Sequence, residues 1–498
     1  MWRPTVPEPN LPFLRLGGVL SEVGFQGREP PLLKIPKSTL RRHVCILGRS
    51  GAGKSFTGMV LVNELLKQKV PVMVLDRTGE FADALRPLQG VTVYEPGGKL
   101  SVSPFSSGDR NPSDGVEGAV SLMEHYLHVS IGSGMTPLQA RILREALLKC
   151  YRSLRQAATV SELLNQLRLI QENSKYLKGW AESVEAIFSR LYPFTTGTLA
   201  KVFDSEKPTL SPEAVFTEGV HVVNLGALET DEAKNLLSQV LIKEVFEYGR
   251  KLGPVGDLRF VLLVDEAHHL APNLRDYYSV LERYAIELRK YGMGLLVIAT
   301  RPTLISENIL ANCNTVICHQ LTSSRDIDLA LNYMVNRLEA DRFISDIRTL
   351  DTGEALVQLN DKRNPNPVRC RVGLADHQFL LQVKPAAQQH SALDAVVKKG
   401  GAAQLHEPVP DREDSSWSVY ANLPDWAKGA ATDAYASGGT VLIKRLIDQG
   451  LSNREIKQMI HGSYTVFSAY GTTLKLTELG RKIAVIHGGK PKTPEIQK

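Results

Sequence analysis

Residues 48–55 are the part of this chain whose types and spacing most directly predict chemistry. They read Gly-Arg-Ser-Gly-Ala-Gly-Lys-Ser and match every fixed position of the phosphate-binding motif G-x-x-x-x-G-K-[ST]. An apolar run at 43–47 precedes them, and a helix-compatible run at 56–69 follows. In that context, backbone N–H groups and the positive end of the helix bind a polyphosphate. We expect Lys54 to contact the β- and γ-phosphates and Ser55 to bind Mg²⁺. The residues expected to surround ATP in this loop are Gly48, Arg49, Ser50, Gly51, Ala52, Gly53, Lys54, Ser55 and Phe56.

Two acidic residues, Asp265 and Glu266, end the apolar run at 260–264. Asp265 is expected to orient Mg²⁺ and its water ligands. Glu266 is expected to act as the general base that accepts a proton from the attacking water. Together with the phosphate-binding loop, this pair predicts hydrolysis of the nucleotide rather than binding alone. The alternative is a solvated strand end without catalytic function.

Two arginines are candidates for stabilising charge at the γ-phosphate during hydrolysis. Arg301 follows the strand predicted at 294–300, where an inner strand opens toward the γ-phosphate. Arg289 lies near a helix end, from which it could project to a neighbouring subunit. The alternative for each is an exposed arginine without a catalytic role.

The elements that must position these residues alternate between strands and helices. Near-continuous apolar strands between helices are typical of an α/β fold with a mainly parallel sheet buried on both faces. We predict strands at 70–75, 91–94, 220–225, 315–320, 354–359 and 368–372, a helix at 231–251, and capping boxes at 136–139 and 159–162. The predicted organisation is an N-terminal arm at 1–40, an ATPase core at 41–111 and 216–384, an all-helical insertion at 112–215, a linker at 385–416 and a small C-terminal helical module at 417–498.

The C-terminal module carries the positive charge of the chain. The net charge is +6, and the segment 437–498 alone holds ten Lys/Arg against four Asp/Glu. A helix predicted at 440–449 ends at Gly450, and a capping box at 452–455 opens the next helix at 453–460. This pattern suits a helix-turn-helix or winged helix-turn-helix module that binds nucleic acid. A solvated basic face is the alternative.

Composition excludes several classes of protein. The chain has 498 residues, enough for two or three domains, and its composition is that of an ordinary globular protein. No uninterrupted apolar stretch approaches 18 residues, and the N-terminus lacks a signal-peptide pattern, so we expect a cytoplasmic protein without a membrane partner. Five widely spread cysteines argue against a disulfide framework. Cys313, Cys318 and His319 could be metal ligands, but buried thiols are the favoured interpretation.

These motifs, taken in order, resemble the HerA-type ATPases of the HerA–FtsK superfamily over about 15–375. The resemblance is carried by the phosphate-binding loop and by the motifs Asp76-x-x-Gly79-Glu80-Phe81, Leu263-Val264-Asp265-Glu266-Ala267-His268, Leu288-Arg289-Lys290-Tyr291-Gly292, Ala299-Thr300-Arg301-Pro302, Ile309-Leu310-Ala311-Asn312 and Gly353-Glu354-Ala355-Leu356. It implies a RecA-like fold, a homohexameric ring and ATP sites between subunits. It also implies that Arg289 is an arginine finger supplied in trans and that Arg301 is the arginine of the family's Gln-Arg-Pro motif.

The chain departs from the family pattern at three points. Thr300 stands where the family usually has a sensor Gln beside the nucleotide, and Arg77-Thr78 replaces the usual Pro-His. The N-terminal β-barrel typical of cellular HerA is expected to be absent or reduced, since only about 40 residues precede the loop. Because that barrel usually docks a nuclease, a partner of this chain would use another surface.

The function expected from these features is that of an ATP-hydrolysing homohexameric motor, a translocase or helicase, that moves double-stranded DNA. It would work with a nuclease or other effector protein in DNA processing or antiviral defence. Phosphate contacts of such a motor are sequence-independent and salt-sensitive. Two alternatives stay open: an ATP-regulated DNA-binding switch that reads a specific site, and a ring scaffold that organises an effector enzyme.

Overall fold

The computed structural model divides the chain into two compact units, Met1–Ser391 and Ala392–Lys498. The residues that the structure describes are 13–20, 30–98, 100–106, 112–131, 134–154, 157–173, 179–205, 209–274, 279–336, 339–359, 366–381, 440–442, 467–470 and 473–476.

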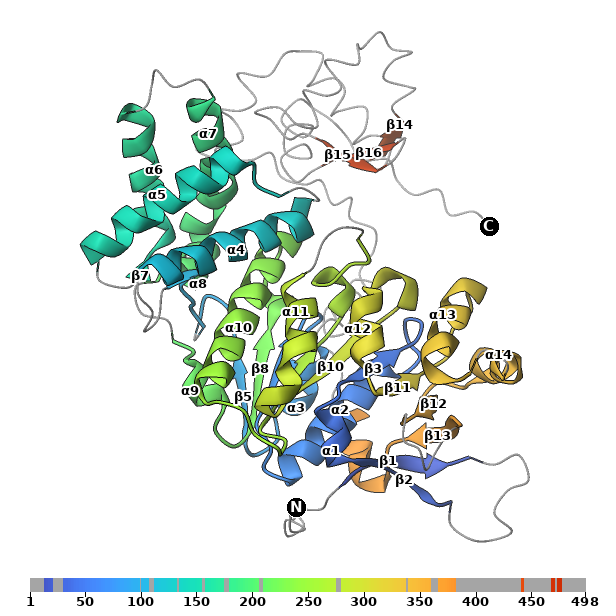
Figure 1. Ribbon diagram of the computed structural model, residues 1–498. Coiled ribbons are helices and arrows are strands. Elements are labelled where there is room, and N and C mark those ends of the chain that lie inside the picture. Colours follow the sequence, from blue (N-terminus) through green and yellow to red (C-terminus); the bar gives the residue numbers. More distant parts are fainter. Residues whose placement is uncertain are drawn as a thin grey trace, which may run out of the picture. The chain divides into compact units, whose positions relative to one another are not determined.

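An eleven-stranded sheet is the frame of the first unit (Figure 1), and its strand order is β2-β1-β13-β12-β11-β3-β10-β9-β4-β8-β5. In chain order the strands are β1 (Phe13–Val19), β2 (Leu32–Pro36), β3 (Val44–Leu47), β4 (Val72–Asp76), β5 (Val91–Tyr94), β8 (Val220–Asn224), β9 (Phe260–Val264), β10 (Met293–Ala299), β11 (Thr315–Cys318), β12 (Glu354–Gln358) and β13 (Val368–Val372). The seven strands from β11 to β5 are parallel, which confirms the predicted mainly parallel sheet.

The parallel strands are apolar on both faces because both faces are covered. Along β3, Cys45 and Leu47 belong to one buried cluster, whereas Val44 and Ile46 belong to the other. The side chains of β4 alternate in the same way. A strand with two buried faces has no solvated positions, which explains the unbroken apolar runs in the sequence.

The N-terminal arm predicted as irregular at 1–40 contains regular structure, so that prediction was wrong for its described part. β1 and β2 form an antiparallel hairpin, and β1 pairs with β13, which extends the sheet by two strands. Leu14, Leu16 and Ile35 are fully buried there. The Pro- and Gly-rich composition of the arm concealed a short period-two apolar pattern.

Helices cover the sheet on both sides (Figure 1). The predicted helix at 231–251 is confirmed as α10 and runs between the predicted residues. The helices around the sheet are α1 (Lys37–Leu40), α2 (Lys54–Lys67), α3 (Glu80–Leu85), α10 (Asp231–Lys251), α11 (Val280–Glu287), α12 (Glu307–Asn312), α13 (Ser324–Met334) and α14 (Ala340–Thr349).

The segment between β5 and β8 is mostly helical, and α4 of this segment packs against α10. Its helices are α4 (Pro112–Ile131), α5 (Pro137–Leu154), α6 (Val160–Asn173), α7 (Trp180–Leu191), α8 (Gly197–Phe203) and α9 (Pro212–Val215), and its two short paired strands are β6 (Phe105–Ser106) and β7 (Ala157–Ala158). Both predicted capping boxes are present, since Thr136 and Gln139 exchange hydrogen bonds, as do Thr159 and Glu162.

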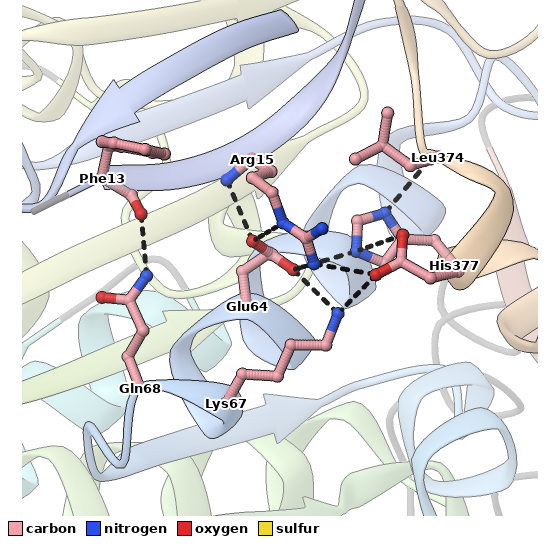
Figure 2. Close-up of polar contacts among 8 residues, drawn as sticks. Phe13, Arg15, Glu64, Lys67, Gln68, Leu374 and His377 are labelled. Atoms are coloured by element: carbon pink, nitrogen blue, oxygen red, sulfur yellow. Dashed lines mark hydrogen bonds and ion pairs between the residues drawn. The ribbon is translucent and has the colours of Figure 1, made fainter. Parts of the chain in front are cut away.

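A network of charged side chains joins α2, the helix after the phosphate-binding loop, to residues near the start and near the end of the first unit's sequence (Figure 2). The buried carboxylate of Glu64 accepts hydrogen bonds from Arg15 of β1 and Lys67 of α2 at 2.8–3.0 Å. His377, in the 3₁₀ segment η6 (Ala375–Leu381), contacts Glu64 through Nε2 at 3.1 Å. Its Nδ1 accepts from the Leu374 N–H, so Nε2 carries the proton. The carboxylates here are already paired with Arg15 and Lys67, which makes the cluster an ion-pair network rather than a cation site.

The described part of the second unit is a three-stranded antiparallel sheet. It contains β14 (Thr440–Leu442), β15 (Phe467–Tyr470) and β16 (Thr473–Leu476) in the order β14-β16-β15. The helix predicted at 440–449 was therefore wrong at its start, where β-branched Thr440 and Val441 pair with β16 instead. The linker at 385–416 and the helix predicted at 453–460 lie outside the described residues. Within the described residues, none of the helices has the length and apolarity to span a bilayer.

Candidate nucleotide-binding and hydrolysis site

The phosphate-binding loop connects the carboxyl end of β3 to the amino end of α2. Gly48, Gly51 and Gly53 have φ angles of 152°, 75° and 106°, which a side chain would strain. A hydrogen bond from Arg49 N–H to the Gln320 carbonyl and one from Gly353 N–H to the Ala52 carbonyl hold the loop at its two sides. The predicted strand–loop–helix unit is confirmed.

His319 directly follows β11 and packs against this loop. Its ring contacts Thr57 Oγ1 at 2.8 Å through Nε2 and the Glu354 carbonyl at 2.7 Å through Nδ1. A Cβ added to Gly48 would lie 2.6 Å from the His319 Cβ, so the imidazole and the loop backbone are in direct contact. Both ring nitrogens are engaged, which argues against the metal-ligand interpretation of His319. All five cysteines of the chain are buried free thiols, as favoured.

Lys54 is buried at the start of α2 and lies among acidic residues. Its ammonium donates to the Arg49 carbonyl at 3.0 Å, inside the loop. Burial lowers the pKa of Lys54, although the charges of Glu266, Asp265 and Glu80 act in the opposite direction. The lysine is thus positioned at the loop, near Asp265, the predicted Mg²⁺ ligand, and Glu266, the predicted general base.

Asp265 is a buried carboxyl group at the end of β9, next to β4 in the sheet. Thr78 donates to it at 3.3 Å, and the neighbouring turn is fixed by Asp76, which accepts from the Gly79 and Ala82 N–H groups at 2.9 and 2.8 Å. Burial and the nearby carboxylates of Asp76, Glu266 and Glu80 raise the pKa of Asp265 to about 8. An added cation would relieve both effects, so the donor set fits a divalent ion.

Glu266 follows Asp265 in a left-handed backbone conformation, with φ 46°. The Thr300 hydroxyl lies 2.8 and 2.7 Å from its two carboxylate oxygens, and His268 Nδ1 lies 3.2 Å from Oε2. Burial raises the pKa of Glu266, but the contacts with His268, Thr300 and Lys54 outweigh it and lower the pKa to about 2. The carboxylate is therefore ionised and can accept a proton. A positive φ in a non-glycine residue is costly and is common at functional sites.

The strand order explains why Thr300 meets Glu266. β10 lies between β3 and β9, so the residue after β10 stands between the loop and the acidic pair. The sequence placed Thr300 at the nucleotide but gave no partner for its hydroxyl, because the order of parallel strands is not encoded locally.

Arg77 is a buried cation at the carboxyl ends of these strands. In the sequence it stands out only as a departure from the family pattern. Its guanidinium donates to Asn235 at 3.0 Å and to Asp231 at 2.6 Å, both in the first turns of α10. Burial lowers its pKa, whereas Asp231, Asp265 and Glu266 raise it. Arg77 thus connects the acidic edge to α10, which in turn packs against α4.

The two candidate arginines lie at opposite ends of the parallel strands. Arg301 follows the carboxyl end of β10, on the same edge as the loop, and its Nε donates to Asp326 at 3.1 Å. Arg289 is exposed in the 3₁₀ segment η4 (Leu288–Tyr291), which precedes the amino end of β10. The seven residues of β10 between them span about 20 Å at roughly 3.3 Å per residue. The structure therefore brings Arg301, but not Arg289, to the loop of the same chain.

The other predicted binding residues lie around the loop with less specific contacts. Ser50 and Gly51 are exposed, and Ser55 is partly buried in the first turn of α2. Phe56 packs close to Gly373, on which an added Cβ would come within 2.8 Å of the Phe56 ring. The hydroxyl of Ser55 and the carboxylate of Asp265 supply the oxygen ligands that Mg²⁺ prefers.

The chain is similar to a helicase family over a little less than half of its length. Residues 22–245 match the family model described as "Helicase HerA, central domain". The chain has a P-loop ATPase fold and is similar to the HerA-type helicases over this region. A probable helicase of Methanocaldococcus jannaschii is 24% identical over 70% of this chain and 68% of its own length. The DNA double-strand break repair helicases HerA of Sulfurisphaera tokodaii and Pyrococcus furiosus are 26% and 25% identical over 68% and 64% of the chain. The chain spans 66% and 62% of the lengths of these two relatives.

Solved structures support the RecA-like fold of this chain. VirB4 of Thermoanaerobacter pseudethanolicus matches with a TM-score of 0.57 and 18% identity, over 74% of the chain and 97% of VirB4. The plasmid coupling protein TrwB bound to the GTP analogue GDPNP matches with a TM-score of 0.52 and 16% identity, over 74% of the chain and 95% of TrwB. Another TrwB structure contains ADP and Mg²⁺. At these identities the likeness concerns the fold.

Proposed function

We propose that this chain is the subunit of an ATP-hydrolysing motor that translocates double-stranded DNA. The observation that carries the proposal is the separation of Arg289 from the phosphate-binding loop of its own chain. The loop, Lys54 and Glu266 lie at the carboxyl edge of the parallel strands, whereas Arg289 lies at the amino edge. A finger at that position serves a nucleotide only in a neighbouring copy. A ring of subunits, with six as the family resemblance implies, satisfies this requirement.

The chemistry proposed for the site follows from its own residues. Backbone N–H groups of the loop and the Lys54 ammonium bind the phosphates of ATP. Ser55 and Asp265 would hold Mg²⁺, which would supply charge neutralisation at the phosphates. Glu266 takes a proton from the attacking water as the water oxygen bonds to the γ-phosphorus and the bond to the β–γ bridging oxygen breaks, which releases ADP; Thr300 orients the Glu266 carboxylate. Arg301 supplies positive charge at the same edge, and Arg289 of a neighbouring subunit stabilises the charge of the transition state.

DNA is proposed as the second substrate because the relatives named above are helicases of DNA double-strand break repair. The partner that the family resemblance implies is a nuclease or another effector protein, in DNA processing or antiviral defence. A motor of this type binds the DNA backbone, so its affinity should fall steeply with salt and vary little with sequence.

Mixed assemblies test the shared site. Arg289→Ala subunits keep the loop and Lys54→Ala subunits keep the finger, so neither alone should hydrolyse ATP. Mixing them creates interfaces with one intact loop and one intact finger. Partial recovery of ATP turnover, with a ring threaded by duplex in electron microscopy, supports the motor. An absence of recovery at every mixing ratio would contradict a finger supplied in trans.

A DNA-binding switch is the second candidate, favoured by the basic C-terminal segment 437–498. It predicts affinity for one duplex sequence and ATP turnover that does not depend on duplex length. Turnover that rises with duplex length and ignores sequence would instead favour the motor. A scaffold that organises an effector predicts that the assembly forms without DNA and that ATP controls the effector.

A further inference from the structure

His43 is a buried histidine immediately before β3, outside the site described above. Only 2% of its surface is exposed, and its φ is 63°, in the left-handed region. The backbone conformation is uncommon for a residue with a side chain, although His, Asn and Asp tolerate it best. Such strain at a fully buried position indicates that surrounding contacts hold the residue in place.

The ring of His43 connects two elements through defined hydrogen bonds. The Leu295 N–H of β10 donates to Nδ1 at 3.1 Å, so Nδ1 carries no proton. Nε2 therefore carries the proton and donates to the Ala285 carbonyl of α11 at 2.7 Å. Burial lowers the pKa of His43 to about 4; the hydrogen bond to the Ala285 carbonyl acts in the opposite direction, and the positive charge of Arg289 adds a smaller lowering. The ring is neutral, with one tautomer selected by its two backbone partners.

Ala285 lies in the last turn of α11, where the final carbonyls of a helix lack intrahelical partners. The Leu288 N–H donates to the Tyr284 carbonyl, and the His43 Nε2–H donates to the Ala285 carbonyl. Directly after this turn the chain changes to the 3₁₀ segment η4, which presents Arg289. The position of Arg289 thus depends on where His43 fixes the end of α11.

We propose that His43 is a positioning residue for Arg289, holding the end of α11 against the strand that leads into the phosphate-binding loop. The inference rests on the proposed function, because the role of Arg289 comes from it. β3 begins after His43 and ends at the loop. Within one subunit, this short strand therefore connects the subunit's own nucleotide site to the segment that carries Arg289, the finger proposed to act in a neighbouring subunit. Movement of the loop on binding ATP is thereby coupled to the finger.

Two substitutions separate the two hydrogen bonds of the ring. His43→Gln places an amide N–H near the position of Nε2 and can still donate to Ala285. His43→Asn places its amide near Nδ1, tolerates the left-handed backbone and loses the contact with Ala285. We expect His43→Asn to lower ATP turnover about tenfold to a hundredfold, with nucleotide affinity within about twofold of wild type. His43→Gln should keep most of the turnover. Wild-type turnover in His43→Asn, or equal losses in both variants, would overturn the proposal.

Mixed subunits distinguish an effect on the finger from an effect on the variant's own loop. His43→Asn subunits should recover turnover when mixed with Lys54→Ala subunits, which supply a correctly placed Arg289. They should not recover when mixed with Arg289→Ala subunits, since neither partner then offers a working finger. Recovery with Arg289→Ala would place the defect at the loop of the His43 variant and refute the positioning role.

Controls keep this test separate from that of the proposed function. Failure of Arg289→Ala with Lys54→Ala counts against the shared site itself. In that case His43→Asn is combined with Arg289→Lys in one chain. If the fold-losses of ATP turnover multiply in the double variant, the two residues act independently and the role of His43 is refuted. His43→Met, which also lacks the N–H, replaces His43→Asn if that variant does not fold. His319→Gln is the matched control, because this second buried imidazole contacts the loop and should weaken nucleotide binding instead.

Discussion

The hydroxyl of Thr300 lies 2.8 and 2.7 Å from the two carboxylate oxygens of Glu266, so a residue after β10 orients the acid after β9. One hydroxyl proton serves either oxygen, and the contact holds the carboxylate plane toward the strand that separates it from the loop. Thr300 therefore orients the proposed general base, and it stands at the position where HerA-type ATPases usually have Gln.

Thr300→Val tests this orientation, since it removes the hydroxyl and keeps the shape. A hydrogen bond to a charged group is worth about 1.5–3 kcal/mol, so ATP turnover should fall roughly tenfold or more. Nucleotide affinity should change little, because Thr300 contacts the acid. Steady-state turnover and equilibrium binding of a fluorescent ATP analogue measure the two quantities. Thr300→Ser keeps the hydroxyl and is the control; a loss equal to that of Thr300→Val would contradict the model.

Glu266→Gln should bind ATP and assemble like the wild type but hydrolyse it at least about a hundredfold more slowly, as expected for loss of a general base. Single-turnover release of phosphate measures the chemical step directly. The amide is isosteric, so retained nucleotide binding shows that the site is intact. Turnover within a few fold of wild type would remove Glu266 from its proposed role.

Gly48→Ala should abolish nucleotide binding, because the new Cβ would lie 2.6 Å from the His319 Cβ at a φ of 152°. The loop must shift to relieve the clash, and its N–H groups then no longer converge on a phosphate. Isothermal titration with ATP and Mg²⁺ checks this. Gly256→Ala is the control, since a Cβ there meets nothing within 4 Å. Normal ATP binding by Gly48→Ala would show that the loop does not need this approach.

Glu64→Gln should destabilise the first unit at neutral pH by about 3 kcal/mol, the cost of breaking a buried ion pair. Burial raises the pKa of Glu64, but His377, Arg15 and Lys67 outweigh it and hold the pKa well below its usual range. A carboxyl group with a lowered pKa stabilises the fold above the unfolded pKa of 4.5, and that stability is lost as the pH falls. Wild type should therefore lose stability between about pH 5 and pH 2, while Glu64→Gln should lose less.

Urea unfolding at pH 7 and pH 4 measures both effects of Glu64→Gln. Asp376→Asn is the matched control from the same network, in which Asp376 pairs with Arg15 at 2.8 Å and with Lys67 at 2.9 Å. The Asp376 side chain is 44% exposed, so solvent screens these ion pairs. Asp376→Asn should cost less than about 1 kcal/mol. Equal losses in the two variants would show that burial of Glu64 is not what makes this network stabilising.

The sequence by itself determined the elements whose signals are local. The loop motif, the helix α10, the two capping boxes and the acidic end of β9 depend on residues within one turn or one strand, and all stand where they were predicted. The alternation of apolar strands with helices also sufficed to predict a mainly parallel sheet, because burial on both faces leaves its mark on each strand separately.

Only the tertiary structure decided which of these residues meet. Strand order put Thr300 against Glu266, put His319 under the loop and placed Arg289 at the edge away from it. The pairings of β1 with β13 and of β14 with β16 escaped prediction because the partner strands lie farther along the chain. Hydrogen bonds between strands and contacts across a sheet edge join residues that share no local pattern, so no window of the sequence contains them.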